Sequence, residues 1–220
     1  MKALNLPNQI TLARLILSVV FFALLSQYSQ RRADEQAWLL DASALLYLIA
    51  AGTDFFDGYL ARKYGLVTAL GRVMDPLVDK VLVCGTFILF AGAGFADELG
   101  RSVTGVQSWM VIAIVGREML VTGLRGYNET VGVNFGASIF GKLKMWTQSI
   151  TAIVVLIVTA RAGRSISNAT ALTVNSIVVW LTVTVTIASA MQYVYQSRHI
   201  LEDVSDQDDH GSEPKQGVST

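Results

Sequence analysis

The sequence has 220 residues, of which 52% are hydrophobic and 15% are charged, and its formal net charge at pH 7 is zero. Charged residues make up roughly a quarter of an ordinary soluble domain, so this composition favours a membrane protein. The sequence shows neither a basic face nor a nucleic-acid recognition motif. We therefore expect no nucleic-acid partner.

Stretches without charged side chains follow one another along the chain, at 15–30, 42–53, 81–96, 102–116, 145–160 and 165–197. A membrane-spanning helix needs about 20 mostly apolar residues, so several of these stretches must extend into flanks that carry charge. The pattern predicts an all-α, polytopic membrane protein with six transmembrane helices that lie in a lipid bilayer. The charged residues are then expected at the helix ends.

Basic residues set the expected orientation. If both termini are cytoplasmic, most Lys and Arg residues lie on that side, in agreement with the positive-inside rule. Residues 1–200 are expected to form the membrane domain. Residues 201–220 are polar and acidic without apolar periodicity, which predicts a disordered tail.

Four aspartates stand at the ends of two predicted helices. Asp54 and Asp57 are three residues apart, and Asp75 and Asp79 are four residues apart. Each pair therefore projects from one face of an α-helix. If these two faces pack together, the four carboxylates converge on one site.

Acidic side chains inside a membrane are costly, at roughly 2.5–3.5 kcal/mol each near mid-bilayer, and a bound divalent cation would compensate them. Carboxylate ligands suit Mg²⁺, Mn²⁺ or Ca²⁺, whereas Zn²⁺ usually binds Cys or His. The alternative is a set of ion pairs between packed helices. That alternative needs as many basic residues as acidic residues close to the aspartates, and it does not explain the glycines of the segment.

Small residues and one arginine accompany the aspartates. Gly58 and Ala61 are three residues apart and clear a groove where a ligand can approach the backbone. Arg62 follows one helical turn after Gly58, where its planar guanidinium can meet a phosphate. Gly71 is consistent with a turn in the linking segment.

These segments resemble the signature of the CDP-alcohol phosphatidyltransferase family, D-x-x-D-G-x-x-A-R, eight residues, then G-x-x-x-D-x-x-x-D. Every defined position matches: Asp54, Asp57, Gly58, Ala61, Arg62, Gly71, Asp75 and Asp79. The resemblance implies CDP-diacylglycerol as donor. It also implies that the four aspartates bind two divalent metal ions, Mg²⁺ or Mn²⁺. It also implies that Asp79 is the catalytic base. The CDP-binding residues that it implies are Gly58, Ala61, Arg62 and Gly71.

A segment near the N-terminus, from Pro7 to Arg14, looks like the N-terminal segment of the same family. Asn8 and Thr11 are three residues apart and can both face the nucleotide, so they join the expected CDP-binding residues. The alternative is that Asn8 caps the first helix and that Arg14 reaches the membrane interface. The sequence leaves both interpretations open.

Basic residues gather at the ends of the fourth and fifth predicted helices, on the same side as the aspartates in the expected topology. Such a group can hold an acceptor that itself carries a phosphate. The alternative is that the lysines anchor lipid headgroups and that Glu118 pairs with a base. The candidate acceptor-phosphate ligands are Arg117, Arg125, Lys142 and Lys144.

The same two segments resemble the phosphatidylglycerophosphate synthase branch of the family, with its patterns R-E-x(5)-L-R and G-K-x-K-T-x-x-Q. Met145 stands where Thr is usual, and Gln148 is present. The resemblance implies glycerol 3-phosphate as acceptor, a homodimer, and a bacterial inner (cytoplasmic) membrane, with an active-site cavity that faces the cytoplasm.

Other functions stay open at this point. A sister enzyme of the family would use inositol phosphate, serine or phosphatidylglycerol as acceptor. A divalent-cation transporter would need acidic residues near the midplane with access from both faces. A noncatalytic scaffold would tolerate the loss of Asp79.

Overall fold

The computed structural model describes the backbone of residues 6–64, 69–130 and 139–210, and the side chains of residues 9–53, 77–126, 141 and 143–196. Helices dominate these ranges, which confirms the all-α prediction. Each uncharged stretch of the sequence overlaps one of the α-helices. The α-helices are α1 (Leu6–Leu25), α2 (Ala33–Tyr64), α3 (Ala69–Phe90), α4 (Ser108–Thr130), α5 (Ile139–Arg161) and α6 (Asn168–His210). Short 3-10 helices, η1 (Gln30–Arg32) and η2 (Ala93–Phe95), precede α2 and follow α3.

Polar side chains mark two of the helix boundaries. After α1, Ser26 Oγ and Gln27 Nε2 each donate to the backbone carbonyl of Ala23 at 3.0 Å. Such bonds compete with continuation of the helix. At the start of α6, Ser167 Oγ accepts a hydrogen bond from the backbone N–H of Thr170 at 3.1 Å, as an N-cap residue does.

The core lies where the helices meet. α1 packs against α2 and α3, α2 packs against α5, and α6 packs against α5 and α4. Each of the first five α-helices contributes a fully buried large side chain: Phe21, Tyr47, Phe87, Met110 and Leu156. Apolar packing therefore joins all five helices into one bundle.

Large apolar side chains also face outward, as Ile112 (72% exposed) and Ile177 (62% exposed) show. An apolar exterior of this kind suits lipid. Within the described residues, Leu143–Arg161 and Asn168–Gln196 are long and apolar enough to cross a membrane. The segments Gln9–Leu25 and Gln30–Thr53, bent by 73°, would add a third span if they cross together. The chain is an integral membrane protein.

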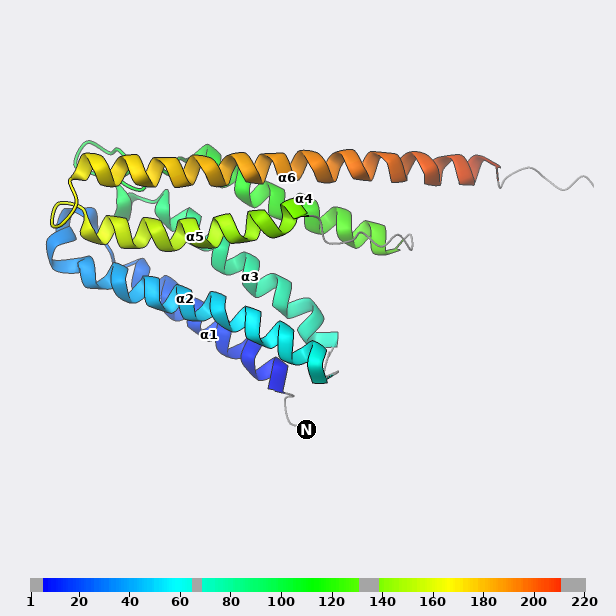
Figure 1. Ribbon diagram of the computed structural model, residues 1–220, viewed down its shortest axis with the longest axis horizontal. Helices are drawn as coiled ribbons and strands as arrows, with labels where there is room; N and C mark the ends of the chain where they lie inside the picture. The colour runs from blue at the N-terminus through cyan, green and yellow to red at the C-terminus, as the bar shows by residue number, and fades with distance from the viewer. Residues whose placement is uncertain (1–5, 65–68, 131–138, 211–220) are drawn as a thin grey trace, which may run out of the picture.

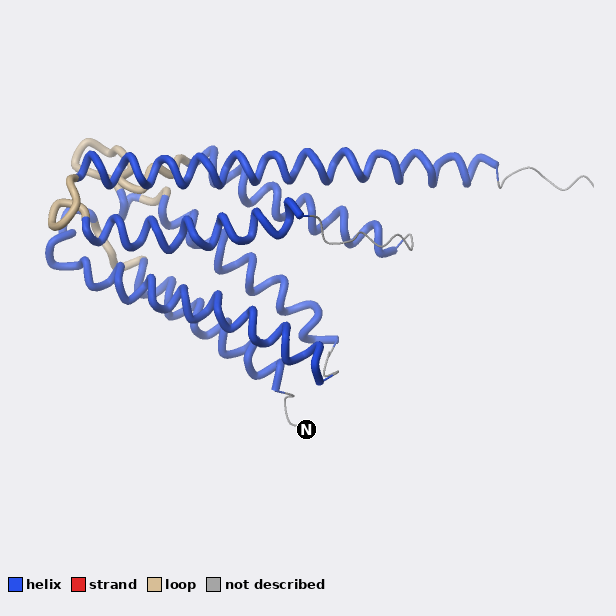
Figure 2. Tube along the Cα trace, viewed as in Figure 1, coloured by secondary structure: helices blue, strands red, loops and turns tan. Residues whose placement is uncertain are grey.

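The helices alternate in direction, so their ends collect at two opposite ends of the bundle (Figure 2). The loops at 26–32, 91–107 and 162–167 lie at one end. The start of α1, the end of α2, the start of α3, the end of α4 and the start of α5 point toward the other end, which we call the N-terminal end of the bundle (Figure 1). The segments singled out by the sequence all belong to this end.

A cavity of about 360 Å³ lies at the loop end, lined by Asp97, Arg101 and Asn175 among others. Asp97 accepts hydrogen bonds there from the backbone N–H of Arg101 at 2.8 Å and from its Nε at 3.0 Å. These bonds, chiefly the backbone one, hold the pKa of the Asp97 carboxyl below its usual value. This cavity is remote from the aspartate motif and is not the predicted active-site cavity.

The last helix extends beyond the predicted domain boundary at residue 200. α6 continues to His210 and projects past the other helices (Figure 1). Extending an existing helix costs no new nucleation, so a polar segment can continue a helix that is stabilised elsewhere. The backbone of residues 201–210 is thus helical, residues 211–220 lie outside the described residues, and the disorder of the tail stays a prediction.

Candidate functional site

The aspartate motif occupies two helix ends that are consecutive in the chain. Asp54, Asp57, Gly58, Ala61 and Arg62 lie in the last turns of α2. Gly71, Asp75 and Asp79 lie in the first turns of α3. Since only residues 65–68 separate the two helices, both halves of the motif belong to the N-terminal end of the bundle.

Asp79 is the motif residue whose side chain the structure describes, and it is half-buried. The side chains of Asp54, Asp57, Asp75, Arg62 and the motif's small residues lie outside the described residues. Among the described side chains, no group of three or more His, Cys, Asp or Glu residues could hold a metal ion. The donors of the motif are all carboxylates, which fits a hard divalent cation.

The N-terminal segment lies inside α1. Because α1 begins at Leu6, Asn8 lies within the first turn and not at the N-cap position. Its side chain is outside the described residues. Thr11 is 4% exposed and Arg14 is 1% exposed, so both side chains are buried among the helices. The capping alternative for Asn8 is therefore wrong, and the binding role of Asn8 and Thr11 stays a prediction.

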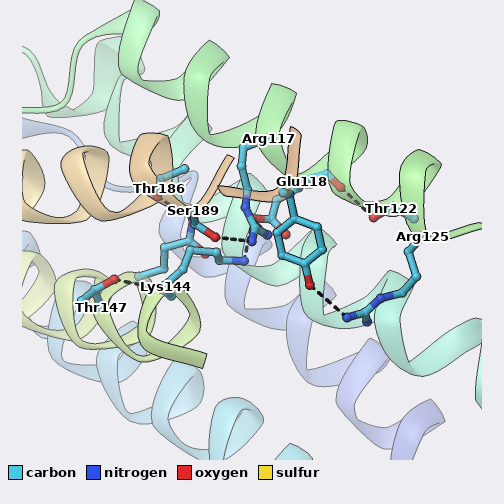
Figure 3. Close-up of polar contacts among 10 residues, drawn as sticks. Arg117, Glu118, Thr122, Arg125, Lys144, Thr147, Thr186 and Ser189 are labelled. Carbon is cyan, nitrogen blue, oxygen red and sulfur yellow. Dashed lines mark hydrogen bonds and ion pairs between the residues drawn. The ribbon is translucent and has the colours of Figure 1, made fainter. Parts of the chain in front are cut away.

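Three charged side chains from α4 and α5 meet in the interior, as Figure 3 shows. Lys144 Nζ donates to Glu118 Oε1 at 2.5 Å, and Arg117 Nη1 donates to the same oxygen at 3.3 Å. Arg117, Glu118 and Lys144 are 8%, 6% and 7% exposed. We call these three residues the buried charge cluster.

The buried charge cluster carries more positive than negative charge. Arg117 and Lys144 supply two positive charges against the one negative charge of Glu118. The Nε atom of Arg117 is also buried without a hydrogen-bond partner among the described residues. An uncompensated buried charge is costly, so the cluster suits an anionic ligand.

Helix α6 supplies polar partners to both arginines of α4 (Figure 3). Ser189 Oγ accepts a hydrogen bond from Arg117 Nη2 at 2.7 Å. The Tyr193 ring lies 5.6 Å from Arg117 Cζ, and the Tyr193 hydroxyl accepts a hydrogen bond from Arg125 Nη2 at 3.2 Å. Arg125 itself is exposed. The structure thus brings Arg117, Arg125 and Lys144 of the predicted acceptor pocket into one region, while the Lys142 side chain lies outside the described residues.

The buried charge cluster lies near the aspartate motif. Lys80, the residue after Asp79, is within electrostatic range of Glu118, Lys144 and Arg125. Cys84, one turn further along α3, is within range of Glu118 and Asp79 together. The start of α3 therefore faces the charged region that α4 and α5 form.

Sequence reasoning overlooked Ser189 and Tyr193, because α6 contains no charged residue before Arg198. A weaker signal was available. Thr182, Thr186, Ser189 and Tyr193 recur at helical spacing within an apolar run, and a polar stripe of this kind marks an interface between membrane helices. In the structure Thr186 Oγ1 accepts a hydrogen bond from Gln148 Nε2 at 3.4 Å, in line with that signal.

The fold and the site together define an integral membrane protein with carboxylate-bearing and cationic groups at one end of a helical bundle. The sequence model of the family described as CDP-alcohol phosphatidyltransferase matches residues 4–188. The chain belongs to this family. Its members generally depend on a divalent cation.

Named relatives support the same assignment. A Bacillus subtilis protein named CDP-diacylglycerol--glycerol-3-phosphate 3-phosphatidyltransferase is 39% identical over 158 residues, which cover 70% of this chain and 77% of the relative. A Rickettsia felis protein of the same name is 31% identical and covers 86% of this chain and 93% of its own length. An Oryza sativa protein named cardiolipin synthase (CMP-forming) is 32% identical over 160 residues, or 71% of this chain and 46% of the relative.

Proposed function

We propose that this protein is an enzyme that transfers the phosphatidyl group of CDP-diacylglycerol to glycerol 3-phosphate. The products are phosphatidylglycerol phosphate and CMP, so the enzyme acts in phospholipid biosynthesis. The relatives named for this reaction support the proposal, since two of them align with most of the chain. The family match supports CDP-diacylglycerol as the donor. The choice of glycerol 3-phosphate as acceptor is also supported by the structure.

The observation that carries the acceptor assignment is the excess positive charge of the buried charge cluster. Arg117 and Lys144 share one carboxylate, Glu118, and all three side chains are more than nine-tenths buried. A phosphorylated acceptor brings the compensating negative charge, and an arginine binds phosphate through paired N–H donors. A neutral acceptor such as serine would leave the cluster uncompensated.

The donor site is assigned to the aspartate motif by its family signature. We assign Asp54, Asp57, Asp75 and Asp79 as ligands of divalent ions, Mg²⁺ or Mn²⁺, with two ions as the proposed number. When bound, these ions would neutralise the pyrophosphate and the charge that develops on the departing CMP. The proposed CDP-binding residues are Asn8, Thr11, Gly58, Ala61, Arg62 and Gly71.

The chemistry is a phosphoryl substitution. The acceptor hydroxyl oxygen forms a bond to the phosphorus that carries diacylglycerol, and the bond from that phosphorus to the CMP oxygen breaks. The hydroxyl proton passes to a carboxylate oxygen of Asp79, the proposed general base. Arg117, Arg125, Lys142 and Lys144 would hold the acceptor phosphate so that its hydroxyl approaches in line.

The proposed membrane arrangement follows the sequence pattern and the helix alternation. All six α-helices would cross the bilayer, with the N-terminal end of the bundle and its active-site cavity on the cytoplasmic side of a bacterial inner membrane. The charged residues of α3 and α4 would then lie near that interface, where their cost is smaller. We further propose a homodimer as the assembled form.

A second acceptor is favoured by one observation, the similarity to a protein named cardiolipin synthase (CMP-forming). Phosphatidylglycerol would then replace glycerol 3-phosphate. Its phosphate is a diester and carries one negative charge, whereas the phosphate monoester of glycerol 3-phosphate carries more. The excess charge of the cluster therefore favours the monoester.

The test is CMP release by the purified protein in detergent with CDP-diacylglycerol and Mg²⁺ or Mn²⁺. Separate reactions contain glycerol 3-phosphate, inositol phosphate, serine or phosphatidylglycerol. CMP release that depends on glycerol 3-phosphate is the expected result. Release with another acceptor alone would retain the family chemistry and overturn the acceptor, and no release with any acceptor would overturn the proposed function.

A further inference from the structure

Tyr193 of α6 is a buried tyrosine that touches both arginines of the α4 segment. Its side chain is 4% exposed. The ring faces the Arg117 guanidinium, with Cζ 5.6 Å from the ring centroid, within the range of a cation–π contact. The hydroxyl oxygen accepts from Arg125 Nη2 at 3.2 Å. One aromatic side chain therefore spans two cations that are two helical turns apart on α4.

These contacts restrict cations that would otherwise adopt many rotamers. Arg117 is held from three directions, by Glu118 Oε1, by Ser189 Oγ and by the Tyr193 ring. Arg125 is exposed, and its hydrogen bond to the Tyr193 hydroxyl joins it to the buried residues. A long exposed side chain loses considerable conformational entropy when it binds a ligand, and an existing contact reduces that loss.

We infer that Tyr193 is a positioning residue that orients Arg125 and Arg117 toward the phosphate of the acceptor. This inference rests on the proposed function, because it assigns those arginines to the acceptor. It gives α6 a part in acceptor recognition, although the helix carries no charge in that region. Ser189, one turn before Tyr193, acts on Arg117 from the same face of α6.

The geometry separates the two contributions of Tyr193. Tyr193→Phe keeps the ring beside Arg117 and removes the hydroxyl that accepts from Arg125. We expect the KM for glycerol 3-phosphate to rise roughly three- to tenfold, as for loss of a hydrogen bond to a partly exposed charged group. The KM for CDP-diacylglycerol and kcat at saturating acceptor should stay within about twofold of the parent values, because phosphate binding is common to ground and transition states.

Two controls distinguish positioning from a general structural effect. Tyr28→Phe removes the hydroxyl of another buried tyrosine, at the loop end of the bundle, where it donates to Gln30 Oε1, and should leave both KM values unchanged. Tyr193→Phe added to Arg125→Ala should raise the acceptor KM no further, because the hydroxyl acts through Arg125. Thermal unfolding of each variant in detergent reports whether the fold is retained.

The experiment measures CMP release while each substrate is varied for the parent, the single variants and the double variant. An unchanged acceptor KM in Tyr193→Phe, equal increases for both substrates, or an equal further increase in the Arg125→Ala background would overturn the inference. Assays of the parent enzyme distinguish failure of the Tyr193 inference from failure of the proposed function. If the parent uses another phosphorylated alcohol in place of glycerol 3-phosphate, the proposed acceptor is wrong, and the same comparison with that alcohol still tests Tyr193.

Discussion

Removal of the one negative charge in the buried charge cluster should destabilise the protein strongly. In Glu118→Gln, Arg117 and Lys144 stay buried but lose their shared carboxylate. At an effective dielectric constant of about 20, the gross attraction of Glu118 is about 7 kcal/mol to Lys144 at 2.5 Å and about 5 kcal/mol to Arg117 at 3.3 Å. Desolvation offsets much of this, and loss of one partner from a buried pair typically costs about 3–5 kcal/mol.

The predicted cost is large enough to measure by thermal unfolding in detergent. For a chain of this size, about 3–5 kcal/mol corresponds to a decrease in Tm on the order of 10 °C. Unfolding of membrane proteins in detergent is often irreversible, so all variants must be compared at one scan rate. Asp41→Asn is a matched control, because Asp41 pairs with Arg161 where both side chains are more than 40% exposed. Loss of such a pair should cost less than about 1 kcal/mol.

A second variant identifies the cause of the destabilisation. Glu118→Gln combined with Lys144→Met removes one buried cation together with the carboxylate, so the double variant should be more stable than the sum of the single effects predicts. A Tm for Glu118→Gln within about 2 °C of the parent would refute the electrostatic reasoning. Strictly additive single effects would show instead that the residues contribute through packing.

Asp79→Asn should abolish CMP release, although the variant should still insert and elute like the parent on size exclusion. Asp97→Asn, at the loop end of the bundle, is the control and should retain the parent rate. Turnover by the Asp79 variant would contradict the assigned base. Chelation of divalent ions should stop CMP release, and added Mg²⁺ or Mn²⁺ should restore it, whereas full activity in excess chelator would contradict the metal assignment. Arg117→Ala or Lys142→Ala should raise the KM for glycerol 3-phosphate more than that for CDP-diacylglycerol, and equal increases for both substrates would count against an acceptor-phosphate pocket.

The helices and the donor motif could be predicted from the sequence, because both depend on short-range patterns. An uncharged stretch forms a helix in lipid since the backbone must satisfy its own hydrogen bonds there. The spacing of Asp54 and Asp57, and of Asp75 and Asp79, places each pair on one helix face whatever the rest of the chain does. The family match later confirmed the family that this spacing indicated.

The alternative roles of residues in the N-terminal segment could not be decided from the sequence, because they depend on where α1 begins and which side chains are buried. Asn8 was an equally good N-cap by residue type, and the start of α1 at Leu6 excludes that role. By residue type Arg14 was equally suited to an outward-facing position on α1, but it is 1% exposed. Residue type alone does not determine where a helix begins or which face is covered.

The sequence by itself determined the membrane class, the helical architecture and the chemical type of the donor motif, because these follow from composition and from spacing within one segment. Only the tertiary structure decided the partners of the cations. Glu118 and Lys144 are 26 residues apart, and Arg117 and Ser189 are 72 apart. Contacts at such separation depend on how α4, α5 and α6 pack, and each helix sequence is compatible with several packing arrangements. The contacts of Ser189 and Tyr193 on α6 with the arginines of α4 could therefore be identified only from the tertiary structure.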